Sequence, residues 1–249
     1  MMYSPLEQFA IISLIPFHIG NFYFSFTNSS LFMLLTTGFF LLLFYFVTVN
    51  GGNLVPSRWQ SFVEMIYEFV ANLVEEQVGQ KGKKYFPLIF TIFTFLLFSN
   101  LIGMIPYSFT TTSHLIVTFS LSLTIYIGFN IIGIKKHKIH FLNLLLPSGS
   151  NIFLVPLLVP LELISYIFRV ISLPVRLFAN MMAGHTLLKI ISGFAWAMLN
   201  VNSFIFIAHF IPLLLLVVLI GLEFGVAMIQ AYIFTILTSM YINDALNLH

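Results

Sequence analysis

The sequence predicts an all-α integral membrane protein with about three transmembrane helices (one helix plus a hairpin), an amphipathic surface helix, and two long tilted intramembrane helices that form a second hairpin. Composition is the first reason: 59% of the 249 residues are hydrophobic and only 7% are charged, whereas a soluble domain has roughly 25% charged residues. The second is the length of the apolar runs, which reach across a hydrocarbon core about 30 Å thick. The third is a stripe of charged residues inside one of these runs.

The composition also narrows the classes of function. The net charge of +2 is too small, and the basic residues are too scattered, for binding to nucleic acid. The absence of cysteine excludes disulfides, zinc thiolates and iron–sulfur ligation, and neither a metal nor another cofactor is expected. No phosphate-binding loop of the form G-x-x-x-x-G-K-[ST] occurs, so no nucleotide is expected to bind directly.

The N-terminal half is interpreted as four segments. Residues 1–30 are aromatic and irregular, and we expect them to form an interfacial arm. Residues 31–49 are long enough for one span, and the turn sequence Asn-Gly-Gly-Asn at 50–53 ends it. Residues 56–78 repeat apolar side chains at three- and four-residue spacing between glutamates, which indicates an amphipathic helix on a membrane surface. Residues 86–134 form a hairpin of two spans.

Basic residues predict the orientation of these segments. The lysine clusters at 81–84 and 135–138 are separated by two crossings, so both lie on one side of the membrane together with Arg58. The positive-inside rule places that side in the cytoplasm or matrix and the lysine-free N-terminus outside. The first thirty residues contain no Lys or Arg, unlike a secretory signal or a mitochondrial transit peptide. We therefore expect a bacterial protein or one made inside the organelle that uses it.

Residues 151–241 contain two unusually long apolar segments joined by a turn with Asn200 and Asn202. Each segment is on the order of 38 residues, or roughly 57 Å as a helix, against a hydrocarbon core about 30 Å thick. The two helices must therefore be steeply tilted, bent, or partly embedded. Four prolines are expected to kink them: Pro156, Pro160, Pro174 and Pro212.

A polar stripe runs along the first of these long helices. Six residues fall within a sector of about 80° on a helical projection: Glu162, Ser165, Arg169, Ser172, Arg176 and Asn180. A charge at the bilayer centre costs about 2.5–3.5 kcal/mol on insertion scales, so these side chains face protein or water. Arg169 can be explained by a structural role instead of a functional one, since it can form an ion pair with Glu162. Arg176 has no carboxylate within one helical turn, and we expect it to be functional.

The second long helix carries a weaker polar pattern. Glu223 and Gln230 are seven residues apart and share a face. His209 shares that face if Pro212 does not break the helical phase. His185 lies on the side of its own helix opposite Arg176. These side chains are candidates for a second polar path.

The residue types in the two patterns favour proton transfer. Carboxylates and histidines at membrane depth can gain or lose a proton. Arginine stays protonated, so Arg176 is expected to act as an electrostatic barrier between two proton paths and not as a relay. Moving one proton across a membrane is worth about 2.3 kcal/mol per 100 mV. A protein of this kind can convert that energy into motion of a partner that bears a carboxylate.

Several motifs resemble those of one family. The segment 172–185, SLPVRLFANMMAGH, resembles the signature of subunit a of the rotary (F-type) ATP synthase, most closely the mitochondrial form. The resemblance covers essentially the whole chain, with further agreement in SPLEQF at 4–9, GMIPYSF at 103–109, LEFGVA at 222–227 and IQAY at 229–232.

This resemblance implies a function and a set of residue roles. The chain would be the proton-translocating stator subunit of ATP synthase and not an enzyme by itself. By the resemblance, Arg176 faces a ring of c subunits, His185 and Glu223 line the outer half-channel, and Glu162 serves the matrix-side half-channel. Asn180 and Gln230 would flank the arginine, with Arg169, Ser165 and Ser172 as a secondary polar stripe.

The resemblance also implies partners and a location. The expected partners are the ring of c subunits, other stator and membrane subunits of ATP synthase, and membrane lipids. The last two helices would form a tilted hairpin curved against the ring. The expected location is the mitochondrial inner membrane, with several crossings and the N-terminus in the intermembrane space.

The sequence leaves two alternatives to the proton-translocating function. A haem- or quinone-associated subunit of a redox complex would need paired histidines that face each other on two spans, whereas His185 and His209 are single. A passive assembly scaffold would tolerate loss of Arg176 without any change in proton flux.

Overall fold

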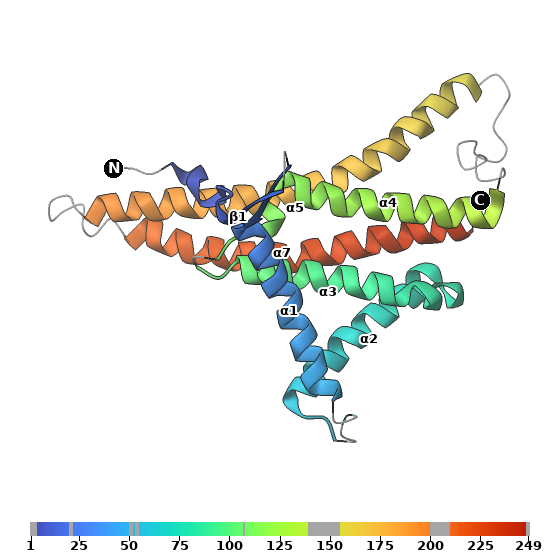
Figure 1. Cartoon of the computed structure of the whole chain (residues 1–249), viewed down its shortest axis with the longest axis horizontal. Coiled ribbons are helices and arrows are strands. Elements are labelled where there is room, and N and C mark those ends of the chain that lie inside the picture. Colours follow the sequence, from blue (N-terminus) through green and yellow to red (C-terminus); the bar gives the residue numbers. More distant parts are fainter. Residues whose placement is uncertain are drawn as a thin grey trace. The chain divides into compact units, whose positions relative to one another are not determined.

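A computed structural model describes residues 4–19, 22–49, 52, 55–106, 108–138, 155–199 and 210–247. Tyr107, His209, the loop at 147–151 and the turn at 200–202 lie outside the described residues, as does most of the predicted turn at 50–53. Figure 1 shows the helices in chain order. Within the described part, five helices are long and apolar enough to cross a membrane, and the predicted all-α membrane fold is confirmed.

These five helices differ in length. Three are of ordinary spanning length: α1 (Asn28–Thr48), α3 (Phe86–Gly103) and α4 (Leu115–His137). The other two, α5 (Val155–Leu199) and α7 (Phe210–Leu246), have 45 and 37 residues. A helix of 45 residues is about 68 Å long. Pro160 and Pro174 lie inside α5, which stays helical through both. The tilt of these helices in a membrane stays a prediction.

The N-terminal arm is more regular than predicted. It contains a 3-10 helix, η1 (Pro5–Phe9), and two antiparallel strands, β1 (Ser13–Ile19) and β2 (Phe22–Thr27), whose register runs from Ile19 opposite Phe22 to Ser13 opposite Thr27. The sequence pattern did not predict these strands, and the interfacial position of the arm stays a prediction. Aromatic and β-branched residues favour strands, and Pro16 is tolerated because both strands of a two-stranded sheet are edge strands.

Helix α2 (Arg58–Val78) is the predicted amphipathic helix. The Ser57 side chain caps its N-terminus by accepting a hydrogen bond from the Gln60 amide, and Gly79 ends it with φ of 71°, a conformation that favours glycine. Its buried side recurs at helical spacing and includes Val63, Ile66, Val70, Leu73, Val74 and Val78. Glu64 and Glu68 are exposed on the other side. Its position at a membrane surface stays a prediction.

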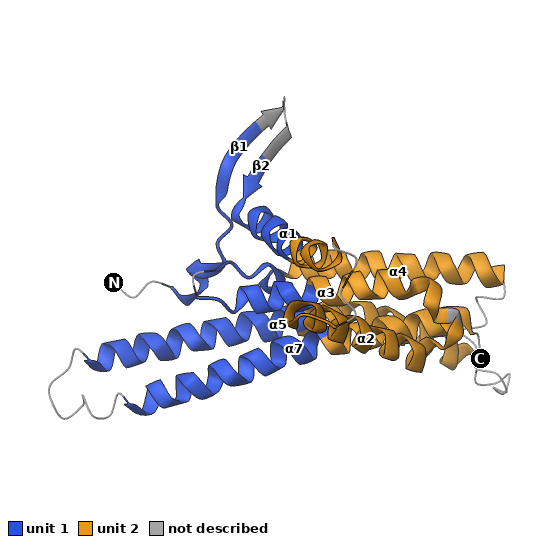
Figure 2. Ribbon diagram, turned by 90° about the horizontal axis from the view of Figure 1, so that it is seen from below, with its two compact units in different colours: residues 1–39, 96–114, 177–231 blue, residues 40–95, 115–176, 232–249 orange. Residues whose placement is uncertain are grey.

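The chain divides into two compact units (Figure 2). Unit 1 contains residues 1–39, 96–114 and 177–231, and unit 2 contains residues 40–95, 115–176 and 232–249. The division falls after Arg176 on α5 and after Ala231 on α7. Each long helix therefore contributes to both units.

Candidate functional site

In unit 1, α5 and α7 bring His185 and Glu223 together. The Nδ1 atom of His185 lies 3.6 Å from Oε1 of Glu223. The Glu223 side chain is only 6% exposed, and neither of its carboxyl oxygens has a hydrogen-bond partner among the described residues. A buried polar group without such a partner is costly, so this carboxyl group requires a functional reason. The structure thus joins two residues that the sequence placed on separate helices.

Gly184 makes room for the carboxyl group of Glu223. A Cβ atom at position 184 would lie 2.6 Å from Glu223 Oε1 and 2.9 Å from its Cδ. The side chain of Glu223 therefore rests directly against the backbone of α5. A larger residue immediately before His185 would push the carboxyl group away from its present place.

The second ring nitrogen of His185 contacts the bend between α3 and α4. His185 Nε2 lies 3.0 Å from Oγ1 of Thr110, and the ring of Phe9 meets the imidazole edge-on with 6.5 Å between ring centroids. Thr110, Thr111 and Thr112 were not among the residues predicted to form the site. Their signal was a run of hydroxyl residues between two apolar spans, and all three are buried. Within the described residues, the polar partners of His185 are thus Thr110 and Glu223.

Two hydrogen bonds from amide side chains add further polar links in unit 1. Asn180 Nδ2 donates a hydrogen bond to Gln230 Oε1 at 3.2 Å, so these two predicted residues also meet across α5 and α7. Asn100, which sequence reasoning missed, is fully buried on α3 and donates to the Ala227 carbonyl of α7 at 3.1 Å. The sequence feature that could have predicted a role for Asn100 is an asparagine inside an otherwise apolar span.

Two cavities adjoin these side chains. One, of about 230 Å³, is lined by Asn180, Gly184 and Glu223 among others. The other, of about 750 Å³, is lined by His185, Thr110 and Lys189 together with the N-terminal arm and the end of α3. One water occupies about 30 Å³ in the liquid, so each cavity has room for several waters beside groups that can exchange protons.

In unit 2, Arg169 lies between two carboxylates. Its guanidinium is 4.0 Å from Glu162, as the spacing on α5 predicts, and 3.5 Å from Asp244 on α7. Sequence reasoning missed Asp244. Its spacing could have predicted a role, because Asp244 follows Glu223 by three heptads and therefore shares a face of the helix with it. These side chains are about two-fifths exposed or less in the isolated chain.

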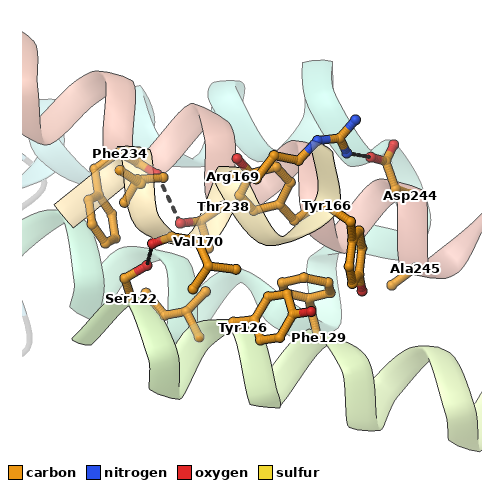
Figure 3. Close-up of a pocket in the computed structure, with 13 residues that line it drawn as sticks. Ser122, Tyr126, Phe129, Tyr166, Arg169, Val170, Phe234, Thr238, Asp244 and Ala245 are labelled. Atoms are coloured by element: carbon orange, nitrogen blue, oxygen red, sulfur yellow. Dashed lines mark hydrogen bonds and ion pairs between the residues drawn. The ribbon is translucent and has the colours of Figure 1, made fainter. Parts of the chain in front are cut away.

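Figure 3 shows Arg169 on the lining of a small cavity, with its guanidinium directed at Asp244. Tyr166 donates a hydrogen bond of 2.6 Å to Asn130, Ser122 donates one of 2.9 Å to the Val170 carbonyl, and the Arg169 guanidinium lies 6.0 Å from the ring centre of Tyr241. Tyr166, Ser122, Arg169 and Tyr241 are among the residues that line a cavity of about 20 Å³, which is more than the roughly 10–15 Å³ that the centre of one water needs.

The remaining residues of the predicted stripe have fewer contacts. Ser172 donates a 3.4 Å hydrogen bond to the Arg169 carbonyl, and Ser165 is half-buried on α5. Arg176 is exposed, and it makes no ion pair within the described ranges. The described residues also contain no group of three or more His, Cys, Asp or Glu arranged to hold a metal ion.

The fold and these side chains define a multi-pass membrane protein that carries ionisable groups within its apolar helices. The chain belongs to the ATP synthase A chain family, whose model matches residues 30–243. Over 252 residues it is 62% identical to ATP synthase subunit a of Marchantia polymorpha, covering all of both chains. It is 61% identical to ATP synthase subunit a-2 of Arabidopsis thaliana, covering 99% of this chain and 72% of the relative.

A more distant relative also matches over almost the whole chain. The chain is 52% identical over 247 residues to ATP synthase subunit a of Chondrus crispus, covering 99% of this chain and 97% of the relative. The predicted family is therefore confirmed. As a member of it, the chain is a membrane proton-channel component of the ATP synthase complex.

Proposed function

We propose that this chain is the stator subunit that provides two offset proton half-channels to a ring of c subunits, with Arg176 between them. Proton flow through these paths would turn the ring and so drive ATP synthesis in partner subunits. The observation that carries the proposal is the buried carboxyl group of Glu223. It has no hydrogen-bond partner among the described residues and lies 3.6 Å from His185.

The outer path would use the unit 1 residues. Protons would arrive through the cavity beside Thr110 and Lys189 and reach His185. The imidazole can hold or release a proton near neutral pH, and its Nδ1 atom is directed at Glu223. Glu223 would then hand the proton towards the ring, alongside the linked amides of Asn180 and Gln230.

The matrix-side path would use the unit 2 residues. Glu162 and Asp244 both lie near Arg169, so this path would have two carboxylates that share one cation. Such an arrangement keeps the carboxylates oriented without burying a free charge. A proton released by the ring would pass to Glu162 and then to the matrix.

Arg176 would separate the two paths. Arginine cannot lose its proton in a protein, so it repels protons at this point and does not conduct them. Its side chain is exposed in the isolated chain and has no ion-pair partner in the described part. Because an unpaired charge at membrane depth is expensive, we infer that a ring carboxylate supplies the partner.

The location and orientation follow from the same proposal. The chain would lie in the mitochondrial inner membrane, with membrane lipids around its exposed apolar helices. The lysine clusters at 81–84 and 135–138 would face the matrix, and the N-terminus would face the intermembrane space. Other stator and membrane subunits would contact the remaining surface.

The test is proton pumping by the complete ATP synthase complex reconstituted into vesicles, with Arg176→Ala in this chain. ATP-driven acidification of the vesicles should be lost while the assembled complex is retained. Arg58→Ala, which removes a cation from the N-terminus of α2, is the control and should pump normally. Unchanged pumping by the Arg176→Ala complex would refute the barrier role and favour a passive scaffold.

A further inference from the structure

The two ring nitrogens of His185 contact different parts of unit 1. Nδ1 faces the Glu223 carboxyl group of α7 at 3.6 Å, whereas Nε2 lies 3.0 Å from the hydroxyl oxygen of Thr110, at the bend that follows α3. The ring of Phe9 packs edge-on against the same imidazole. The contact with Thr110 is the closer of the two polar contacts, and it fixes which nitrogen is presented to Glu223.

Thr110 is itself held in place. It is buried and immediately precedes η3 (Thr111–Ser113), yet its side chain makes no capping hydrogen bond to that helix. Ser113 instead donates a 2.6 Å hydrogen bond to the Thr110 carbonyl. Gly103 allows the close approach to α3, because a Cβ atom there would lie 2.8 Å from Thr110 Cγ2. The hydroxyl group is therefore fixed in position and available to His185.

A hydroxyl group suits a histidine that changes its protonation state. It has one hydrogen to donate and two lone pairs that accept. When the ring is neutral with its hydrogen on Nδ1, the Thr110 hydroxyl can donate to Nε2. When the ring is protonated, Nε2–H donates to Thr110 Oγ1, and the hydroxyl hydrogen can turn to the Gly103 carbonyl, which lies 3.4 Å away. The ring need not rotate between the two states.

We propose that Thr110 is a positioning residue that holds the imidazole of His185 with Nδ1 directed at Glu223, in both protonation states of the ring. The inference rests on the proposed outer proton path. The charged groups that face His185 within the described residues are Glu223 from α7 and Lys189 from its own helix. Thr110 adds no charge to this set, and its effect is on the orientation of the ring.

The first experiment compares two substitutions of Thr110 in the reconstituted ATP synthase complex by ATP-driven acidification of vesicles. Thr110→Val keeps the shape but removes the hydroxyl, and it should slow proton pumping about tenfold or more, since a hydrogen bond to a group that becomes charged is worth at least an order of magnitude in an equilibrium. Thr110→Ser keeps the hydroxyl and should restore pumping. Equal slowing by serine and valine would overturn the proposal.

A matched control lies two residues away. Thr112 is also buried, and its hydroxyl has no hydrogen-bond partner in the described part of the chain. Thr112→Val removes the same group from the same bend and should leave pumping unchanged. If the Thr110→Val chain does not assemble, Thr110→Ala also removes the hydroxyl without adding bulk. Normal pumping by an assembled valine or alanine variant would refute the role of Thr110.

A second experiment separates this inference from the proposed function. His185→Ala alone should abolish or strongly slow pumping, and a normal rate would contradict the outer path itself. In a His185→Ala background that keeps measurable pumping, Thr110→Val should cause no further loss, because it acts through the missing ring. A further loss of similar size would show that Thr110 acts on something other than His185 and would overturn the inference.

Discussion

Replacing Gly184 by alanine tests how closely the Glu223 carboxyl group must be placed. The new Cβ atom would lie 2.6 Å from Glu223 Oε1, whereas ordinary van der Waals contact begins near 3.4 Å. The carboxyl oxygen must therefore retreat by about 0.8 Å. The present distance to His185 Nδ1 is 3.6 Å, so a shift of this size changes the proton-transfer geometry substantially.

The expected effects on stability and on function differ. Alanine is a better helix former than glycine by about 1 kcal/mol, while overpacking costs about 1–3 kcal/mol, so the net loss of stability should be about 2 kcal/mol or less. A misplacement of about 1 Å in a reacting group can cost on the order of a hundredfold in rate. We therefore expect an assembled complex with Gly184→Ala whose proton pumping is slower by roughly ten- to a hundredfold.

The assay is ATP-driven acidification of vesicles that contain the reconstituted complex, normalised to the amount of assembled complex. Gly193→Ala is the matched control, because it lies on the same helix and a Cβ atom there would meet nothing within 4 Å. This control should pump at the normal rate. A normal rate in the Gly184→Ala complex would show that the position of the Glu223 carboxyl group does not limit proton transfer.

Three further substitutions test the packing of each unit by the thermal denaturation midpoint of the solubilised complex. Asn100→Ala removes a fully buried amide that links α3 to α7, and it should destabilise the chain by about 1–3 kcal/mol; an unchanged midpoint would contradict this. Tyr166→Phe removes the 2.6 Å hydrogen bond to Asn130 and should cost about 1 kcal/mol, with the aromatic packing kept. Lys136→Met removes the amine that donates to the Leu246 carbonyl at the C-terminus of α7; it should destabilise the chain by about 1 kcal/mol and so lower the midpoint, and an unchanged midpoint would mean that this helix end needs no cation.

Much of the fold could be predicted because each helix shows its pattern of apolar residues within its own segment of the sequence. Apolar length alone located the spans, and the three- and four-residue spacing of Val63, Ile66 and Val70 was sufficient for α2. The N-terminal strands were not predicted. Their aromatic residues are compatible with an irregular arm as well as with strands, and strand pairing depends on a second segment of the chain.

The contacts of the candidate site could likewise be predicted within one helix but not between different segments. Residues on one helix, such as Glu162 and Arg169, were paired correctly from their spacing. Asp244 shares the heptad spacing of Glu223 and was still missed, because the sequence does not show which face of α7 meets Arg169. Thr110 gave even less signal, since a hydroxyl residue near a bend is common.

Composition and spacing along single segments were enough to predict that this protein lies in lipid, that it is helical, and that its apolar helices carry charged residues. The folded structure was needed to show which side chains on different segments meet. It placed His185 between Thr110 and Glu223, and it put Arg169 within reach of Asp244. The physical reason is that a contact between helices depends on their rotation and register, which are set by the packing of all their side chains together.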